Sequence, residues 1–164
     1  MQKVEFVPLM LTEKSDIYSI RINDDKETEF RKFIVLFKDS KDAYLKDDFD
    51  RILAAIEKIA QNGALESFFR YEGGINDRVQ AIPLLIKPRN KKKHGTLRLY
   101  CIRISETLVI VGGGGLKVTD TYEENSLLLE HVSRLQEIDA QLSSMEKEGI
   151  KLGDHIMNIT IQID

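Results

Sequence analysis

Alternating apolar and polar residues predict β-strands at both ends of the chain. Near the start, Val4 and Phe6 alternate with polar residues, and Ile20 and Ile22 flank Arg21. This period of two is typical of strands whose sheet is buried on one face. The last residues alternate in the same way, with the apolar positions at Ile159, Ile161 and Ile163.

Two longer segments instead carry apolar residues at helical spacing. The first runs from about Ala43 to Gln61 and stops at Gly63, and the second runs from about Asn125 to Gly149. Glycine tolerates the left-handed conformation that ends many helices. A shorter helix is expected around residues 30–37, where Asp24 with Glu27 resembles a capping box and Thr28 is an alternative cap.

The segment between the two long helices predicts four strands. They fall at about 68–71, 79–86, 97–104 and 107–111, and the last two form the strongest hairpin candidate. Pro83 lacks an amide donor, so its strand should lie at an edge or contain a bulge. Gly112–Gly115 should end the hairpin. The expected order is β-β-α-α-β-β-β-β-α-β, which favours an α+β fold with a mainly antiparallel sheet flanked by helices.

Size and composition are those of a globular protein with one domain, residues 1–164. Apolar residues make up 42% of the chain and charged residues 31%, and the net charge is −3. This balance excludes a globally cationic nucleic-acid binder. The single cysteine, Cys101, excludes an internal disulfide and favours a reducing, cytoplasmic location, and its apolar surroundings favour a small buried residue. No apolar stretch is long enough to span a membrane.

Positive charge is concentrated in residues 87–103, which contain seven basic residues and no acid. The cluster is a candidate phosphate-binding surface, and the alternative is a solvated lysine-rich loop. Arg98 and Arg103 stand in an otherwise apolar strand, where each needs an acidic partner or a ligand. Strand geometry puts Arg98 and Tyr100 on one face and Arg103 on the other. The basic residues are Lys87, Arg89, Lys91, Lys92, Lys93, Arg98 and Arg103.

The glycine run Gly112–Gly115, followed two residues later by Lys117, has two interpretations. Its backbone amides could approach an anion closely, or the glycines could form a bulge that turns the strand, which we favour. The run fits neither a Walker A loop nor a dinucleotide-binding loop. The three histidines are far apart and His131 is expected at the surface, so we expect no metal and no cofactor.

From about Ala54 to Leu142, the chain resembles the RelE/HigB-like toxin superfamily of prokaryotic toxin–antitoxin systems, including its phage-derived toxin-like group. The matching features are a helix that ends before Gly63, a Phe68-Phe69-Arg70 strand, and the arginine-bearing strand 97–103. They continue with Leu108–Val111, a turn that contains Lys117, and Thr119-Asp120-Thr121-Tyr122 leading into a helix. Val118 stands where these toxins commonly have a second lysine, and the four glycines are unusual.

The resemblance implies a RelE-like core at 54–142, with an N-terminal β-β-α extension at 1–53 and a C-terminal strand at 150–164. It also implies a metal-independent endoribonuclease, an mRNA interferase in which a ribose 2′-hydroxyl attacks the adjacent phosphate. Arg98 and Lys117 would then stabilise charge on that phosphate, and Tyr122 would assist proton transfer or stack on a base. The sequence adds RNA contacts by Lys91, Lys92, Lys93, His94 and Arg103.

The implied partners are RNA or the ribosome and a cognate antitoxin, with no membrane. The acidic net charge and the added segments depart from the family pattern, so catalysis could be lost while the fold is kept. The alternative function is a non-catalytic interaction or regulatory protein with a degenerate toxin fold. An exposed terminal strand at 156–163 would then recruit another chain or a second copy, because a free strand edge can pair. Inhibition of another target such as gyrase, as in ParE-type relatives, also stays open.

Overall fold

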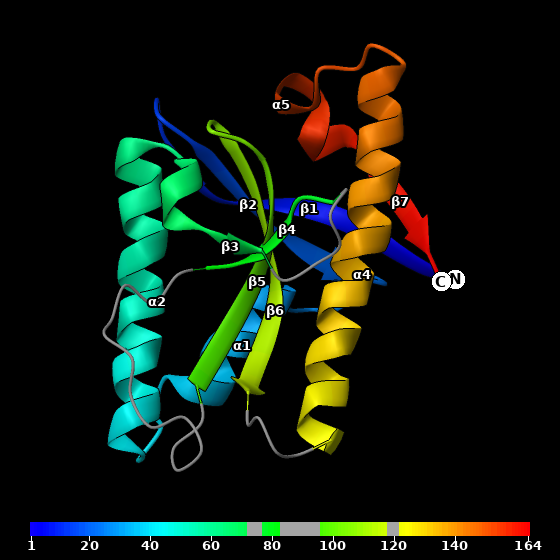
Figure 1. Ribbon diagram of the computed structural model, residues 1–164. Coiled ribbons are helices and arrows are strands. Elements are labelled where there is room, and N and C mark those ends of the chain that lie inside the picture. Colours follow the sequence, from blue (N-terminus) through cyan, green and yellow to red (C-terminus); the bar gives the residue numbers. More distant parts are fainter. Residues whose placement is uncertain (72–76, 83–95, 118–121) are drawn as a thin grey trace.

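The chain forms one seven-stranded sheet with helices on both faces (Figure 1). The computed structural model describes residues 1–71, 77–82, 96–117 and 122–164. The sheet order is β3-β4-β5-β6-β2-β1-β7. All neighbours are antiparallel except β2 and β6, so the predicted α+β class with a mainly antiparallel sheet is confirmed. The strands are β1 (Gln2–Leu11), β2 (Asp16–Ile22), β3 (Arg70–Tyr71), β4 (Val79–Ala81), β5 (Thr96–Ser105), β6 (Leu108–Lys117) and β7 (Thr160–Ile163).

The N-terminal hairpin lies inside the sheet rather than beside it. β2 pairs in parallel with β6, from Asp16 opposite Leu108 to Ser19 opposite Val111. β7 pairs with β1 at the far edge, from Gln2 opposite Ile163 to Glu5 opposite Thr160. The two segments that the resemblance treats as additions therefore complete the same sheet as the β5–β6 hairpin.

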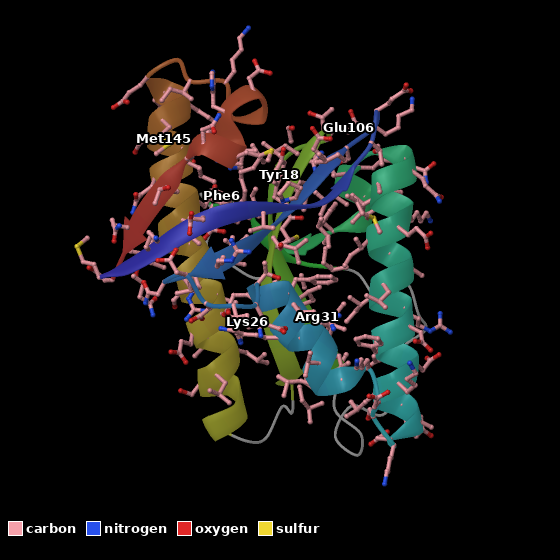
Figure 2. All side chains as sticks on the ribbon, turned by 180° about the vertical axis from the view of Figure 1, so that it is seen from behind. Phe6, Tyr18, Lys26, Arg31, Glu106 and Met145 are labelled. Carbon is pink, nitrogen blue, oxygen red and sulfur yellow. The ribbon has the colours of Figure 1, made fainter. Side chains whose placement is uncertain are left out.

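Each face of the sheet has its own hydrophobic core. One face packs against α1 (Glu29–Phe37) and α2 (Ala43–Asn62), with Phe33, Ile52 and Ile56 at the centre of this core. The other face packs against α4 (Tyr122–Lys147) and α5 (Leu152–His155) through Leu135 and Ile138. Two short 3-10 helices, η1 (Glu66–Phe68) and η2 (Ile156–Asn158), complete the structure. Seen from behind, α1 lies between α2 and α4, and Arg31 points outward (Figure 2).

The helix ends follow local sequence signals. Thr28 caps α1 by accepting a hydrogen bond from the Arg31 amide, so Thr28 rather than Asp24 is the cap. Asp42 caps α2 through the amides of Tyr44 and Leu45. Gly63 and Gly149, both with positive φ, follow α2 and α4 as predicted.

The strand that contains the glycine run is longer than predicted. β6 continues through Gly112–Gly115 to Lys117 and pairs with β5 along its length, so the expectation that these glycines end the hairpin is wrong. The register shifts once within the run, because Leu99 pairs with Gly114 and Cys101 with Val111. The extra residue on β6 is the bulge that the sequence favoured.

Candidate functional site

The register of the β5–β6 hairpin places Arg98 and Lys117 on the same face of the sheet. Arg98 is opposite Gly115, and Thr96 is opposite Lys117. Arg98 and Lys117 are therefore diagonal neighbours, a relationship in which the backbone positions of two strands are roughly 7–8 Å apart. We call this pair the Arg98–Lys117 corner. It contains two of the three residues that the resemblance gives a catalytic role.

α4 covers the face on which this corner lies. Leu128 contacts the position of Gly115, and Leu135 contacts that of Gly112, so α4 runs antiparallel to β6. α4 begins at Tyr122, six residues before Leu128, which is about 9 Å of helix. The start of α4 thus lies at the same end of the molecule as Lys117 (Figure 1). The side chain of Tyr122 is outside the described part of the structure.

Arg98 is a buried charge. Its side chain is only 4% exposed, and its Nε atom is buried without a hydrogen-bond partner. Among the residues that the structure describes, no carboxylate pairs with Arg98. Burying an unpaired guanidinium costs several kcal/mol unless an anion or further hydrogen bonds compensate. Arg98 is therefore a buried basic residue for which the described part of the chain supplies no carboxylate.

Arg103, which the sequence predicts as an RNA contact, forms bonds within the fold. Its Nε donates a hydrogen bond to the Ala64 carbonyl oxygen at 2.6 Å, and its Nη1 lies 3.9 Å from Glu66 Oε1. Both contacts are with the segment that follows α2, on the opposite face from Arg98. The structure does not bring the two arginines together, and Arg103 ties β5 to the end of α2. The other RNA-binding candidates, Lys91, Lys92, Lys93 and His94, lie outside the described residues.

The glycine run is covered by α4 rather than open to an anion. A Cβ atom at Gly112 would lie 2.9 Å from Leu135 Cδ2, and one at Gly113 would lie 2.7 Å from the His131 ring. None of the four glycines has a positive φ. Gly112 and Gly113 are therefore required for close packing of α4 on the strand, which side chains at these two positions would prevent.

His131, which the sequence predicts at the surface rather than as a ligand, is half-buried. Its ring packs on Gly113, and burial, followed by the nearby Arg134 cation, lowers the pKa of its imidazole. Arg134 is itself bound to Glu29 of α1, with Nη1 to Oε1 at 2.7 Å. The position of His131 along its helix could not predict this packing, because the packing depends on the absence of a side chain at Gly113 of β6.

Cys101 is fully buried in the core beneath α2, as its apolar neighbours predicted. Burial raises the pKa of its thiol, so the thiol stays protonated in the folded protein. A nucleophilic role is therefore disfavoured.

The outer edge of the terminal strand is occupied by side chains of α4. Gln141 Nε2 donates a hydrogen bond to the Gln162 carbonyl oxygen at 2.6 Å, and Glu137 Oε2 accepts one from the Asp164 amide at 3.0 Å. Because these backbone groups already have partners, strand addition at β7 would have to displace them. β7 is also shorter than the predicted segment 156–163, whose first residues form η2.

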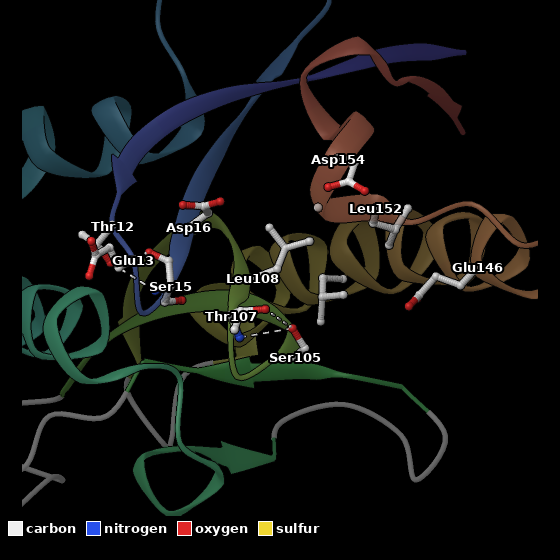
Figure 3. Close-up of a pocket in the computed structure, with 12 residues that line it drawn as sticks. Thr12, Glu13, Ser15, Asp16, Ser105, Thr107, Leu108, Glu146, Leu152 and Asp154 are labelled. Carbon is white, nitrogen blue, oxygen red and sulfur yellow. Dashed lines mark hydrogen bonds between the residues drawn. The ribbon is translucent and has the colours of Figure 1, made fainter.

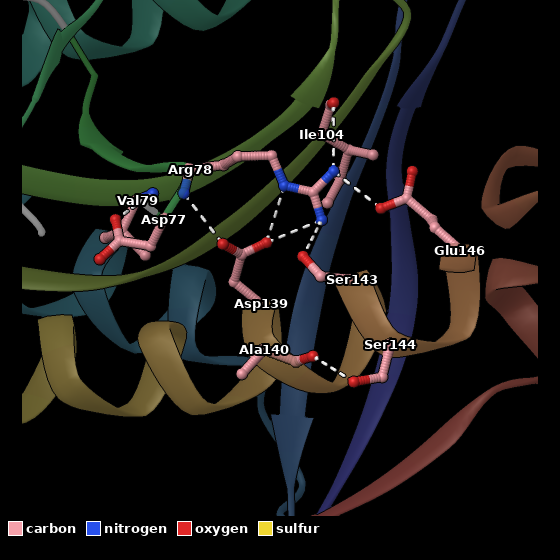
Figure 4. A network of polar contacts seen from close by, with 9 residues as sticks. All are labelled: Asp77, Arg78, Val79, Ile104, Asp139, Ala140, Ser143, Ser144 and Glu146. Carbon is pink, nitrogen blue, oxygen red and sulfur yellow. Dashed lines mark hydrogen bonds and ion pairs between the residues drawn. The ribbon is translucent and has the colours of Figure 1, made fainter. Parts of the chain in front are cut away.

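Sequence reasoning missed a polar network that joins β4 to α4 (Figure 4). Asp139 accepts hydrogen bonds from the Arg78 amide at 2.9 Å and from Arg78 Nε at 2.8 Å. Ser143 and Glu146 hold the rest of the same guanidinium. Asp139 is 2% exposed and follows Ile138 in the apolar stripe of α4, which was the signal available in the sequence. All of these partners of Arg78 belong to α4, so the network fixes α4 on the sheet.

The described residues contain no group of three or more histidine, cysteine, aspartate or glutamate side chains that could hold a metal ion. Within the same residues, no helix combines the length and apolar character needed to cross a membrane. Comparison of the chain with known protein families, with curated proteins and with solved structures finds no match.

Proposed function

We propose that this chain is the toxin of a toxin–antitoxin pair and that it binds RNA at the Arg98–Lys117 corner and cleaves mRNA there. The observation that carries the proposal is the buried guanidinium of Arg98, which has no carboxylate partner among the described residues and has Lys117 as its diagonal neighbour. An RNA phosphate would provide the missing anion, and such charge-assisted contacts are about twice as strong as neutral hydrogen bonds. The residue types also match the roles that the resemblance implies.

In the proposed reaction, the ribose 2′-hydroxyl attacks the adjacent phosphate and displaces the 5′-oxygen of the next nucleotide. Arg98 and Lys117 stabilise the charge that develops on the phosphate. Tyr122 assists proton transfer or stacks on a base, and Lys91, Lys92, Lys93 and His94 contact the flanking RNA. The proposal places the protein in the cytoplasm, acting on RNA or the ribosome, with a cognate antitoxin as its inhibitor.

One observation favours a second candidate, a non-catalytic interaction or regulatory protein with a degenerate toxin fold. Arg98 is 4% exposed, so a phosphate can reach it only if the start of α4 moves or a covering side chain rotates. If no such movement occurs, Arg98 has a structural role and the corner does not cleave RNA. The two candidates therefore differ in whether Arg98 is needed for activity or only for stability.

The test is a cell-free bacterial translation reaction that receives the purified protein, Arg98→Ala, or Arg51→Ala. Arg51 is an exposed arginine of α2 paired with Asp47, so its removal matches the change in charge without touching the corner. We expect translation arrest with transcript cleavage by the wild type and by Arg51→Ala, and none by Arg98→Ala whose fold is verified by circular dichroism.

The possible results separate the candidates. Translation arrest with an intact transcript would reject RNA cleavage and favour inhibition of a target other than mRNA. No arrest by the wild type would reject ribosome-dependent cleavage and favour the interaction protein. Equal cleavage by Arg98→Ala would reject the assignment of the site.

A further inference from the structure

A cavity lies at the opposite end of the molecule from the Arg98–Lys117 corner (Figure 3). β5 begins at Thr96 in that corner and ends at Ser105 in the cavity wall, so the ten-residue strand separates the two by about 30 Å. The cavity has a volume of about 300 Å³, at the lower end of the roughly 300–1,000 Å³ typical of small-molecule sites. The β1–β2 turn, the β5–β6 turn and the α4–α5 region form its walls.

The lining of this cavity is acidic. It contains four carboxylates, and none of its described residues is basic. Only Glu146 has a cationic partner, with Oε1 at 2.8 Å from Arg78 Nη1, whereas the other three form no ion pair with any basic residue that the structure describes. The carboxylates belong to Glu13, Asp16, Glu146 and Asp154.

A second observation in the same wall indicates an absent hydrogen-bond partner. Ser15 lines the cavity and is 1% exposed, and its Oγ is buried without a hydrogen-bond partner. Buried hydroxyls normally form at least one hydrogen bond, because an unpaired one costs about 1–3 kcal/mol. Thr12 beside it uses its own hydroxyl on the Ser15 backbone, so it leaves the Ser15 Oγ unpaired. Ser15 Oγ is thus an unpaired hydrogen-bonding group in the wall of the cavity.

The arrangement of the carboxylates favours an extended cation over a compact one. Glu13 and Asp16 lie on one side of the cavity and Asp154 on the other, with Leu108 between them and Leu152 beside Asp154 (Figure 3). The described residues form no group of three that could chelate a metal ion. Ammonium groups at the ends and methylene groups in the middle would match both the charges and the aliphatic residues.

We propose that this cavity binds a linear aliphatic polyamine. Its ammonium groups would pair with Asp16, Glu13 and Asp154, its methylene chain would contact Leu108 and Leu152, and Ser15 Oγ would accept one N–H bond. The site is independent of the proposed RNA chemistry, since it shares no residue with the Arg98–Lys117 corner.

The experiment measures binding of spermidine to the full chain by isothermal titration calorimetry at low salt. The variants are Asp16→Asn, Asp154→Asn and Ser15→Ala. Glu57→Gln is the control, because it removes one exposed acid of α2 away from the cavity. We expect saturable 1:1 binding by the wild type and the control, and about tenfold weaker binding by each aspartate variant, the size of one charge-assisted hydrogen bond.

Ser15→Ala tests the site with a variant that is expected to fold. It removes an unpaired hydroxyl, so its thermal stability should equal or exceed that of the wild type while its spermidine affinity falls. Unsaturable binding, or equal weakening in Glu57→Gln, would overturn the proposal in favour of diffuse surface charge. Displacement of spermidine by equimolar Mg²⁺ would overturn it in favour of a metal site. Binding of a lysine-rich peptide without spermidine binding would overturn it in favour of a protein partner.

Discussion

Replacing Gly114 by alanine should destabilise the fold far more than the same change at Gly115, one residue along the same strand. A Cβ atom at Gly114 would overlap the Arg98 carbonyl oxygen and lie 2.8 Å from Leu99 Cα. Both obstacles are backbone atoms of β5, so no side-chain rotation relieves them and the two strands must separate. A Cβ at Gly115 would meet only Leu128 Cδ2 at 3.5 Å, an ordinary van der Waals contact.

The expected magnitudes follow from these contacts. Overpacking typically costs 1–3 kcal/mol, and an obstacle made of backbone puts Gly114→Ala at about 3 kcal/mol or more. Gly115→Ala should change the free energy of unfolding by no more than about 0.5–1 kcal/mol, and alanine could stabilise by restricting the unfolded chain. With a urea m-value of about 2 kcal/mol/M, the two midpoints should differ by about 1 M.

Equilibrium unfolding in urea, followed by circular dichroism, measures this difference. The two variants share the chemical change, the strand and the unfolded-state effect, so the comparison isolates the contact with β5. Equal midpoints within about 0.2 M would refute the reasoning and would show that the hairpin is not packed as described.

Three further outcomes are expected. Asp139→Ala should lower the free energy of unfolding by about 3 kcal/mol, because it leaves Arg78 partly unpaired, and urea unfolding beside an exposed-acid variant, Asp47→Ala, checks this. Burial lowers the pKa of His131, so the unfolded chain binds a proton more readily than the folded chain. The free energy of unfolding should therefore fall as the pH drops below about 6.5. The difference between unfolding curves at pH 7 and pH 5 should be smaller for His131→Gln than for the wild type. Cys101 should react with a thiol reagent only after unfolding, and rapid labelling of the native protein would contradict its burial.

The sequence predicted the order of elements well, because each long element carries its own periodic signal. The helix stops at Gly63 and Gly149 and the strands at both ends could be read locally. Sheet order could not be read in this way. The parallel pairing of β2 with β6 joins residues about 90 positions apart, and neither strand contains a residue that specifies the other as its neighbour.

The candidate site was predictable only in part. The period of two along β5 correctly separated Arg98 from Arg103, because strand geometry alone decides which face a residue occupies. The hydrogen bond from Arg103 to the Ala64 carbonyl oxygen could not be predicted, since a backbone acceptor leaves no mark in the sequence. The half-buried position of His131 could not be predicted for a related reason, because it depends on Gly113 of β6.

The glycine run connects the fold to the question of function. Gly112 and Gly113, which lack side chains, let α4 lie directly on β6, and Gly115 in the same run stands opposite Arg98. A run that resembles a phosphate-binding loop in the sequence therefore acts through packing, by bringing a helix over a cation. α4 therefore lies on the face of the sheet that carries the buried Arg98. In the proposed toxin the start of α4 would have to admit a phosphate to Arg98, whereas in the proposed interaction protein it would stay closed. Comparing the translation activity of Arg98→Ala with its stability separates these two cases, because only the first requires activity to be lost while the fold is kept.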